Sequence, residues 1–380
     1  MRISHVVENL NRGGLERVVL DLVREQAALS HACQVLCLFE RGHLADELTA
    51  AGVEVVACGK HRGLDARALR RLRDAIRAHG AEIVHSHNAM AHYYAVAATL
   101  FLGVRRINTR HGMGNFPCSI RRELLFRLSL VATHSVVAVC VPAFRNFVRY
   151  RAVPPSKMVV IHNGIQIDQF HVGDSEARND LRRMLGWGES AVVLGCVARL
   201  NAAKDHETLL RALQMVRVHY PQAGLVLVGD GALRASLEAL SADLKLDQAV
   251  RFLGDRGDVA ELVRGFDLFV LSSLTEGYSI ALIEACAAGV PIVATRVGGN
   301  GEIVYERRNG LLVESRAPQA FAQAVQSLLA DANTRARMAS ESRRLAEQYG
   351  SVKSMSARYL DLYRGHLPVD RSVVSPTGIA

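Results

Sequence analysis

Two glutamates, eight residues apart, flank the start of a predicted helix. Glu276 follows an apolar run at 268–273 that reads as a buried strand, and Glu284 lies about two turns into the helix, which ends before Gly289. A helix start offers free backbone N–H groups and positive potential, which suit a phosphate. A carboxylate there is instead suited to accept hydrogen bonds from sugar hydroxyls. The stretch therefore indicates a site for a phosphorylated sugar such as a nucleotide sugar.

Two cations follow another strand-like run, at 191–199. Arg199 and Lys204 are five residues apart. A diphosphate leaving group develops negative charge, which a guanidinium and an ammonium can stabilise. The sequence has no Asp-x-Asp motif that would hold a divalent ion for this task, so we expect no metal there. Taken alone, each cation is also explained as surface charge on a basic protein.

A glycine turn follows the first strand-like run of the chain. Gly13 and Gly14 separate residues 2–7 from a segment with helical spacing of apolar residues. Without side chains, such a turn lets the backbone approach a ligand closely, as in phosphate-binding loops. It matches neither a GxGxxG fingerprint nor a P-loop, so a tight strand-to-helix connection is an equally good interpretation.

The elements that must position these residues alternate between strands and helices. Strand-like runs lie at 2–7, 34–39, 53–58, 81–87, 106–109, 135–141, 157–161, 191–199, 224–228, 250–253, 268–272, 291–295 and 311–313. This alternation predicts parallel sheets covered by helices on both faces, with ligands at the carboxyl ends of the strands. His87, Asn88 and His111 fall at such ends. The fold class is therefore α/β.

The alternation stops near 163–170 and restarts near 191, so we predict two Rossmann-like domains, at 1–165 and 166–350. Helical patterns at 318–330, 332–348 and 351–364 follow. The C-terminal helix, 351–366, could cross back to the first domain. Residues 367–380 have turn residues and no periodicity, which predicts a disordered tail.

Composition limits the partners and the compartment. The net charge is +9 with a pI of about 9.4, which favours phosphorylated ligands, anionic membrane or nucleic acid, although no nucleic-acid recognition motif is present. No apolar run reaches the roughly 18 residues of a membrane span. The seven cysteines are scattered, many of them in apolar runs that include Cys140, which fits buried reduced thiols in the cytoplasm. His85, His87 and His92 have no carboxylate or cysteine clustered with them, so we expect packing or cleft-lining roles and no metal.

The motifs together resemble those of a known enzyme family. They are Arg199-Leu200-Asn201-Ala202-Ala203-Lys204, Val228-Gly229-Asp230-Gly231, Phe252-Leu253-Gly254, the Glu-x7-Glu stretch, Gly298-Gly299-Asn300-Gly301-Glu302, Gly13-Gly14-Leu15-Glu16-Arg17 and Thr109-Arg110-His111-Gly112. In order and spacing, the chain resembles the retaining nucleotide-sugar glycosyltransferases of family 4, in particular the exopolysaccharide branch. The resemblance implies the GT-B fold, with two Rossmann-like domains facing each other across a cleft.

The resemblance also assigns roles in the second, nucleotide-sugar-binding domain. Arg199 and Lys204 would bind the diphosphate, Glu276 would face the transferred sugar, and Glu284 would accept hydrogen bonds from the ribose. Three backbone N–H groups would donate to phosphate, those of Gly277, Tyr278 and Ser279. Glu302 is a weaker candidate for the donor site.

In the first, acceptor-binding domain, the resemblance places His111 against the transferred sugar and Gly13 and Gly14 near the phosphate or sugar. The implied reaction transfers a sugar from a UDP- or GDP-sugar to a hydroxyl of a glycan or lipid-linked saccharide, with retention and without a cofactor. The resemblance points to bacterial cell-surface or exopolysaccharide synthesis. Alternatives are a GT-B nucleotide-sugar epimerase and a non-catalytic nucleotide-sugar-binding protein.

Basic helices in the first domain raise the question of a membrane partner. Arginines crowd two segments, at 67, 70, 71, 73 and 77 and at 121, 122 and 127, the second among leucines. Such a surface can dock on anionic lipid, which would make the protein peripheral on the inner face of the plasma membrane. A solvated basic face explains the same pattern.

Overall fold

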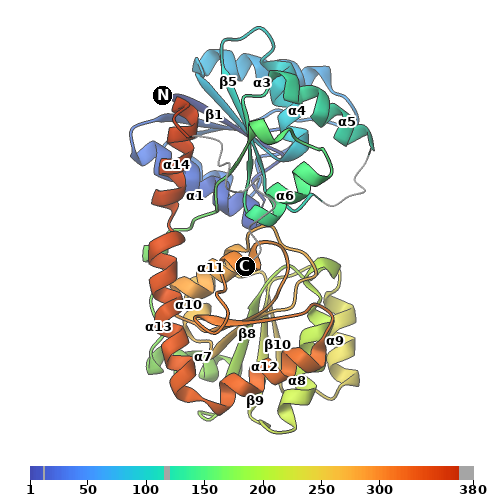
Figure 1. Ribbon diagram of the computed structural model, residues 1–380, viewed down its shortest axis with the longest axis vertical. Coiled ribbons are helices and arrows are strands. Elements are labelled where there is room, and N and C mark those ends of the chain that lie inside the picture. Colours follow the sequence, from blue (N-terminus) through green and yellow to red (C-terminus); the bar gives the residue numbers. More distant parts are fainter. Residues whose placement is uncertain (12, 115–119, 368–380) are drawn as a thin grey trace. The chain divides into compact units, whose positions relative to one another are not determined.

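The computed structural model describes residues 1–11, 13–114 and 120–367. The chain forms two compact units, Met1–Gly164 with Val352–Ala380, and Ile165–Ser351 (Figure 1). The division after Gly164 lies inside the region where the strand–helix alternation stops in the sequence. Except for Leu367, the predicted disordered tail lies outside the described residues.

The first unit is built on a seven-stranded parallel sheet. Its strands are β1 (Arg2–Val7), β2 (Ala32–Cys37), β3 (Glu54–Ala57), β4 (Ile83–His87), β5 (Arg105–Arg110), β6 (Ser135–Ala138) and β7 (Met158–Val160). They run in the order β3-β2-β1-β4-β5-β6-β7. The chain therefore winds outward from β1 in one direction and then from β4 in the other, which is a doubly wound Rossmann-like topology.

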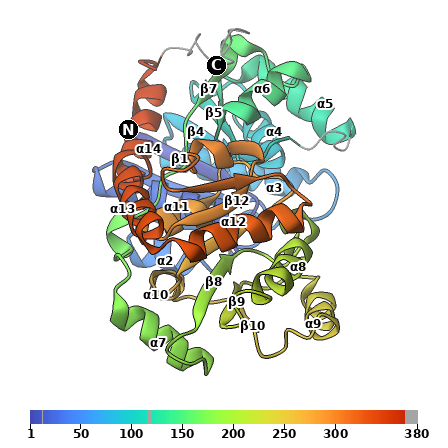
Figure 2. The ribbon, with the colours of Figure 1, turned by 60° about the horizontal axis from the view of Figure 1, so that its bottom comes forward.

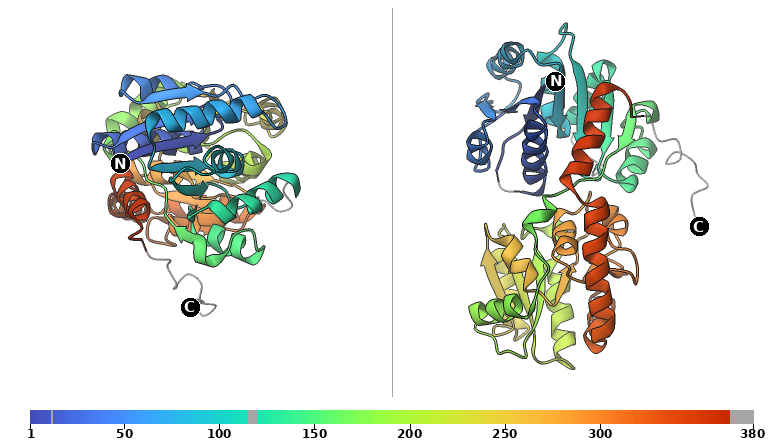
Figure 3. Two further views of the ribbon diagram at one scale, coloured as in Figure 1. Left: turned by 90° about the horizontal axis from the view of Figure 1, so that it is seen from above. Right: turned by 90° about the vertical axis from the view of Figure 1, so that its left-hand side faces the viewer.

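Helices pack on this sheet. They are α1 (Gly14–Ala28), α2 (Ala45–Ala50), α3 (Ala66–His79), α4 (Asn88–Ala98), α5 (Ile120–Ser129), α6 (Val141–Arg149) and α14 (Val352–Arg364). Asp65 caps α3 by accepting from the N–H groups of Arg67 and Ala68, and Gly80 ends it in the left-handed conformation. Helix α14, from the far end of the chain, lies beside α1, as the red and dark blue helices of Figure 3 show. It carries Tyr359 and Tyr363 into the core of this unit.

The second unit repeats the plan with six parallel strands. They are β8 (Val192–Val197), β9 (Ala223–Val228), β10 (Val250–Gly254), β11 (Leu268–Leu271), β12 (Ile292–Thr295) and β13 (Gly310–Val313). Their order is β10-β9-β8-β11-β12-β13. The covering helices are α7 (Ser175–Leu185), α8 (His206–Arg217), α9 (Arg234–Asp243), α10 (Val259–Arg264), α11 (Ile280–Ala287), α12 (Pro318–Ala330) and α13 (Ala332–Tyr349). Helix α12 packs against α8 (Figure 2).

Glycines in the second sheet make room for its aromatic residues. A Cβ at Gly195 of β8 would lie 2.0 Å from Phe266, and one at Gly224 of β9 would lie 2.4 Å from Trp187. Both rings thus pack directly on the strand backbone. This close packing explains why two strands that are buried on both faces carry a glycine.

The prediction of an α/β protein with two Rossmann-like domains is confirmed, and each predicted strand has its counterpart. The predicted strand at 135–141 was too long. It ends at Ala138, and Cys140 is the N-cap of α6, with its thiol accepting from the N–H of Ala143. An apolar run alone does not distinguish a strand from a strand followed by a buried helix start. Among the described residues, no helix is long and apolar enough to cross a membrane.

Candidate functional site

Each sheet has one point where the winding direction reverses. It lies between β1 and β4 in the first unit and between β8 and β11 in the second. Loops at the carboxyl ends of such neighbouring strands diverge and leave room for a ligand. The predicted residues follow these strands or their direct neighbours: Gly13 after β1, His111 after β5, Arg199 and Lys204 after β8, and Glu276 after β11.

In the second unit, the structure brings two predicted residues into direct contact. The Lys204 ammonium Nζ lies 2.5 Å from Oε1 of Glu276, and Ser273 Oγ donates to the same oxygen at 2.6 Å. The side chain of Lys204 is 23% exposed and that of Glu276 is 9% exposed. The pair is therefore largely shielded, and part of the Lys204 side chain remains accessible to solvent.

The backbone around this pair is tied together by short bonds. Ser272 Oγ donates to the carbonyl oxygens of Lys204 at 2.9 Å and Asp205 at 2.7 Å, and Leu274 N–H donates to Ala203 at 2.8 Å. Asp205 adopts the left-handed conformation, with φ of 49°. A non-glycine residue in that region costs about 1–3 kcal/mol, which the surrounding bonds must offset. The loop is thus held in one shape next to Lys204.

The Gly229–Gly231 motif supports the segment that carries the second cation, Arg199. Leu200 N–H donates to Asp230 at 3.0 Å, and Leu233 N–H donates back to Leu200 at 3.1 Å. A Cβ at Gly231 would lie 2.3 Å from the Leu200 carbonyl oxygen. The glycines therefore allow the turn after β9 to press against the segment that carries Arg199. Arg199 itself is exposed at the end of that segment.

The Glu-x7-Glu stretch differs in one detail from the prediction. Helix α11 begins at Ile280, so Glu284 lies just over one turn into the helix and not two. Ser279 is its N-cap and makes no side-chain capping bond, and Gly277 accepts from Gly299 N–H of the neighbouring loop at 2.9 Å. Tyr278 is buried. Glu276 precedes the helix by four residues, so its carboxylate is bound by Lys204 and not by the helix end.

The glycine turn of the first unit opens helix α1. Gly13 is the N-cap with extended backbone, φ −179°, and Gly14 is the first helical residue. Because a glycine carries no side chain, the cap itself satisfies none of the first N–H groups of α1. The predicted close approach of ligand to this backbone stays a prediction.

His111 lies in the loop after β5, fixed from three directions. Its N–H donates to Oδ1 of Asn88 at 3.3 Å, and its Nε2 lies 3.0 Å from Nδ1 of His87. Asn88 is itself held in the left-handed conformation, φ 65°. The preceding Arg110 places its guanidinium over the rings of Phe126, at 4.4 Å, and Phe147, at 4.9 Å. These cation–π contacts anchor the loop.

Behind His111, the structure reveals a buried cluster that the sequence analysis did not identify. His5, His85 and His87 pack with ring centroids 4.2 to 5.5 Å apart. His5 and His85 are direct partners in the pairing of β1 with β4. The available signal was a histidine inside the apolar run at 2–7. Two of the histidines named from sequence, His85 and His87, thus have the predicted packing role.

The third, His92, lies apart from this cluster. Its ring bridges Ser86 Oγ and Thr133 Oγ1, each at 2.7 Å. The nitrogen atoms of His5, His85 and His87 lie within 4.8 Å of one another, a spacing that could hold a metal ion. The absence of a metal site remains a prediction.

Burial keeps these histidines neutral. It lowers the pKa of His5 to about 4 and the pKa of His111 to about 3. It also lowers the pKa of His85 and His87 well below the usual 6.5, with the neighbouring histidines adding to the effect. A neutral imidazole has one donor and one acceptor nitrogen. His111 therefore offers a ligand an uncharged group, in contrast to Lys204 and Arg199.

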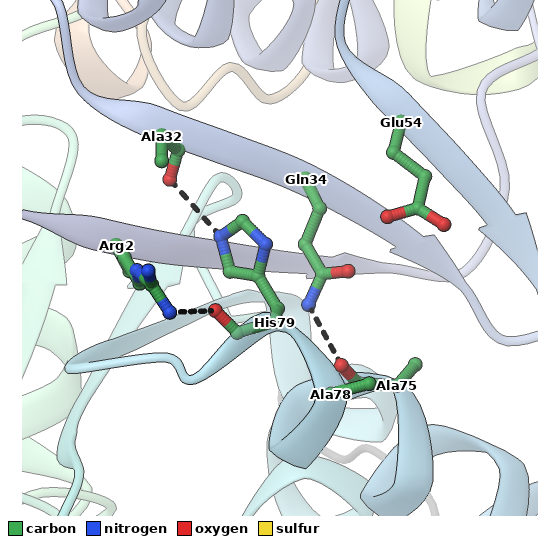
Figure 4. A pocket seen from close by; sticks show the side chains of 7 residues that line it. All are labelled: Arg2, Ala32, Gln34, Glu54, Ala75, Ala78 and His79. Carbon is green, nitrogen blue, oxygen red and sulfur yellow. Dashed lines mark hydrogen bonds between the residues drawn. The ribbon is translucent and has the colours of Figure 1, made fainter.

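A surface pocket of the first unit lies away from these residues (Figure 4). It is lined by Arg2, Ala32, Gln34, Glu54, Ala75, Ala78 and His79. Three of them open β1, β2 and β3, and His79 closes α3. The pocket is therefore at the amino ends of the strands, opposite to where α/β sheets bind ligands. We assign no function to it.

Comparison with known proteins concerns the family and the fold. The profile of the family described as Glycosyl transferases group 1 matches residues 177–345, and that of Glycosyltransferase Family 4 matches residues 12–169. A D-inositol 3-phosphate glycosyltransferase of Corynebacterium urealyticum is 34% identical over 55% of this chain and 51% of its own length. The chain thus spans about half the length of that relative. The putative glycosyltransferase EpsF of Bacillus subtilis is 27% identical over 77% of this chain and 78% of its own length.

Solved structures share the fold at low sequence identity. HepE of Anabaena, crystallised with UDP, has a TM-score of 0.86 and 21% identity, covering 96% of this chain and all of that one. WaaG, a glycosyltransferase involved in lipopolysaccharide biosynthesis, has a TM-score of 0.76 and 18% identity over 96% of this chain. At such identities the likeness concerns the fold alone.

Proposed function

Because this chain belongs to the glycosyltransferases of family 4, with group 1 and family 4 profiles covering most of its length, we propose that it is a retaining glycosyltransferase that uses a nucleotide-diphosphate sugar. The acceptor is a hydroxyl of a glycan or lipid-linked saccharide, in cell-surface or exopolysaccharide synthesis. A UDP-sugar is the first donor to test, since HepE was crystallised with UDP-glucose.

The contact between Lys204 and Glu276 carries the proposal. A surface lysine needs no buried carboxylate, yet here the ammonium lies 2.5 Å from a carboxylate that is only 9% exposed. An ammonium beside a phosphate site stabilises the diphosphate as the glycosidic bond breaks. The carboxylate next to it can then accept hydrogen bonds from the sugar. Lys204 thus serves the diphosphate side of the cleaved bond, and Glu276 serves the sugar side.

The other residues have complementary roles in the proposal. Arg199 helps to neutralise the negative charge of the leaving diphosphate, and the backbone N–H groups at 277–279 donate to the oxygen atoms of that diphosphate. Glu284 accepts from the ribose, and His111 contacts the transferred sugar. The resemblance to retaining GT-B enzymes favours a front-face reaction, in which the acceptor hydroxyl attacks from the face that the diphosphate leaves and the departing phosphate takes its proton. Catalysis then depends on positioning and charge stabilisation.

The test is a panel of UDP- and GDP-sugars, measured first by thermal stabilisation and then by turnover with lipid extracts. At least one nucleotide sugar should raise the melting temperature. Lys204→Ala and Arg199→Ala should remove that shift. Arg211→Ala is the matched control, because Arg211 is an exposed cation of the same unit that pairs with Glu207 on helix α8. A panel without any shift would refute the assignment of a donor site.

Docking on an anionic membrane is a second part of the proposal. Helix α5 and the turn after it expose Leu124, Leu128 and Val131, which are 56%, 62% and 87% exposed, beside the half-exposed Arg127. Exposed apolar side chains next to cations are the combination that binds anionic lipid interfaces. A lipid-linked acceptor would be reached from such a position.

Sedimentation with anionic and neutral vesicles tests the docking. The wild type should bind vesicles rich in anionic lipid, and Leu124→Ser with Leu128→Ser should weaken binding strongly. Replacement of Arg121, Arg122 and Arg127 by glutamate should abolish it. Val218→Ser is the control, since Val218 is 74% exposed in the second unit. Undiminished sedimentation of the leucine and arginine variants would rule out this surface.

A further inference from the structure

A buried chain of hydrogen bonds leads from helix α1 to His111. Oε1 of Gln26 lies 2.8 Å from Nε2 of His5, whose Nδ1 lies 3.2 Å from Nε2 of His87. Nδ1 of His87 then lies 3.0 Å from Nε2 of His111. Gln26, His5 and His87 are at most 2% exposed. Bulk solvent therefore does not reach these three side chains.

The hydrogen bonds that link these three imidazoles can run in one of two donor-to-acceptor directions. Each ring is neutral, so each has one N–H and one lone pair. If the donor of one of these hydrogen bonds is known, the donors of all the following ones are known as well. The amide of Gln26 provides that direction, because its carbonyl oxygen faces His5 while its Nε2 faces Oη of Tyr363 at 3.4 Å.

From Gln26 the protons can be followed atom by atom. The amide oxygen accepts, so His5 carries its proton on Nε2 and has a lone pair on Nδ1. His87 therefore donates from Nε2 to His5 and accepts at Nδ1 from the Nε2–H of His111. His111 is left with a lone pair on Nδ1, a buried atom that has no hydrogen-bond partner among the described residues. The reverse order would leave a buried N–H there, which is rarer in native proteins than an unpaired acceptor.

We propose that Gln26 is a positioning residue which, through His5 and His87, holds His111 as the Nε2–H tautomer and leaves a lone pair on Nδ1. Nδ1 is buried in this structure, so a ligand hydroxyl bonds to it only when the groups that cover it move aside. The assignment of that hydroxyl to the transferred sugar rests on the proposed function. The tautomer itself does not. In this arrangement His111 accepts a hydrogen bond and donates none from Nδ1, which favours a sugar hydroxyl over a phosphate oxygen.

Helix α14 holds the amide of Gln26 in its orientation. Oη of Tyr363 accepts from Gln26 and lies 2.6 Å from Nδ1 of His85. Because the Tyr363 hydroxyl has one proton, it can donate to Nδ1, and His85 then carries its proton on Nε2. That Nε2 lies 2.8 Å from Oγ1 of Thr109, which contacts Oη of Tyr359 at 2.9 Å. Both tyrosines are buried. The C-terminal helix of this unit thus completes the network that ends at His111.

A metal at this cluster would require a different proton arrangement. An ion bound by His5, His85 and His87 needs a lone pair from each ring. The chain instead places a proton between His5 and His87, and both ring nitrogens of His85 already bond Thr109 and Tyr363. Metal binding would break these bonds. The two arrangements are therefore exclusive, and one experiment separates them.

The experiment is long-range ¹H–¹⁵N correlation on protein labelled at the histidine ring nitrogens. The His111 signals are assigned by their loss in His111→Phe. In the wild type, His111 should be protonated on Nε2. In Gln26→Leu, the order is lost and His111 should become a mixture of tautomers. Gln26→Glu should restore the wild-type tautomer, because a side-chain oxygen again accepts from His5.

The control is Gln34→Leu. Gln34 is an equally buried glutamine of the same unit that bonds Ser4 and Ala75, outside the chain, so the tautomer of His111 should not change. A wild-type His111 protonated on Nδ1 would overturn the proposal, as would an unchanged tautomer in Gln26→Leu. Stoichiometric shifts of the His5, His85 and His87 signals with Zn²⁺ at pH 7 would also overturn it.

Kinetics link this inference to the proposed function. Gln26→Leu should lower kcat/KM for sugar transfer roughly tenfold, the size of one weakened hydrogen bond to substrate, and Gln26→Glu should recover most of it. If the tautomer changes as expected while the wild type transfers no sugar, the proposed function fails and the tautomer assignment stands. If transfer occurs and Gln26→Leu leaves kcat/KM unchanged, the positioning role fails.

Discussion

The two candidate sites lie at equivalent points of two similar sheets, yet they use opposite electrostatics. In the second unit, the reversal point between β8 and β11 holds an ion pair, Lys204 and Glu276, with the Lys204 side chain partly exposed. In the first unit, the point between β1 and β4 leads to neutral histidines that are fully buried. The same topology thus supplies charge in one unit and uncharged hydrogen-bonding groups in the other.

This difference follows from what surrounds each loop. Lys204 lies against the carboxylate of Glu276 and its side chain is partly exposed, whereas a histidine behind β1 and β4 cannot be hydrated, so burial lowers its pKa and it loses its proton. A leaving diphosphate needs the first kind of site, and an uncharged sugar needs the second. Each unit also holds one non-glycine residue in the left-handed conformation beside its site, Asp205 and Asn88.

The largest effect should come from removing the charge. We expect Lys204→Ala to lower kcat for sugar transfer by about 10²–10³-fold, the usual size of a lost electrostatic contact to a developing anion. His111→Phe should cost less, because a single neutral hydrogen bond is worth about 1 kcal/mol. Steady-state kinetics on both variants measures the ratio. Equal losses would break the contrast between the two sites.

Acid should destabilise the first unit more than the second. Burial lowers the pKa of seven first-unit histidines from the usual 6.5, and the shift is large for five of them: His5, His85, His87, His92 and His111. The unfolded chain therefore binds more protons below pH 6.5, and the free energy of unfolding falls as the pH drops towards about 4. In that pH range, each such histidine lowers the free energy of unfolding by about 1.4 kcal/mol for each pH unit of acidification.

Two carboxyl groups in the first unit, Glu8 and Asp21, act against this trend, and burial raises the pKa of Glu8. Burial raises the pKa of Asp21 to about 6, so its protonation in the folded state offsets one histidine. In the second unit, burial lowers the pKa of His206 to about 4. Hydrogen–deuterium exchange at pH 7 and pH 5, corrected for intrinsic rates, should show the core of the first unit losing more protection. Equal losses in both units would contradict the expectation.

A smaller effect should follow from adding a methyl group next to the segment that carries Arg199. Gly231→Ala forces the added methyl group against the Leu200 carbonyl, which we expect to destabilise the second unit by about 1–3 kcal/mol and to weaken nucleotide-sugar binding. Gly257→Ala is the control, since a Cβ there meets nothing within 4 Å. Urea unfolding followed by the fluorescence of Trp187, the sole tryptophan, reports on this unit. Identical midpoints for the two variants would show that the loop adapts.

The smallest effect should come from Glu284. It lies just over one turn into α11 and is partly exposed, so Glu284→Gln should hardly change stability. Its loss of charge should weaken nucleotide binding by about tenfold, as for a hydrogen bond to a charged acceptor. Calorimetric titration with a nucleoside diphosphate measures the change. An unaltered affinity would remove Glu284 from the donor site.

Much of the fold followed from the sequence because strands buried on both faces are apolar runs. Such runs at 191–199 and 268–272 predicted β8 and β11 within a few residues. Element ends were less certain. Cys140 reads as part of a strand, since an apolar helix start has the same composition, and only the bond from Ala143 N–H to its thiol identifies the cap. Glu284 was placed a turn too far for a similar reason.

The sequence by itself determined which residue types were available for chemistry: two cations, two carboxylates and a histidine after predicted strands. It could do so because strand ends are encoded locally by apolar runs and turns. Only the tertiary structure decided which of them meet. Lys204 and Glu276 are 72 residues apart and His85 and Tyr363 are 278 apart, and sheet order, which no local pattern encodes, makes them neighbours. Burial, another tertiary property, then lowers the pKa of the histidines and keeps them neutral.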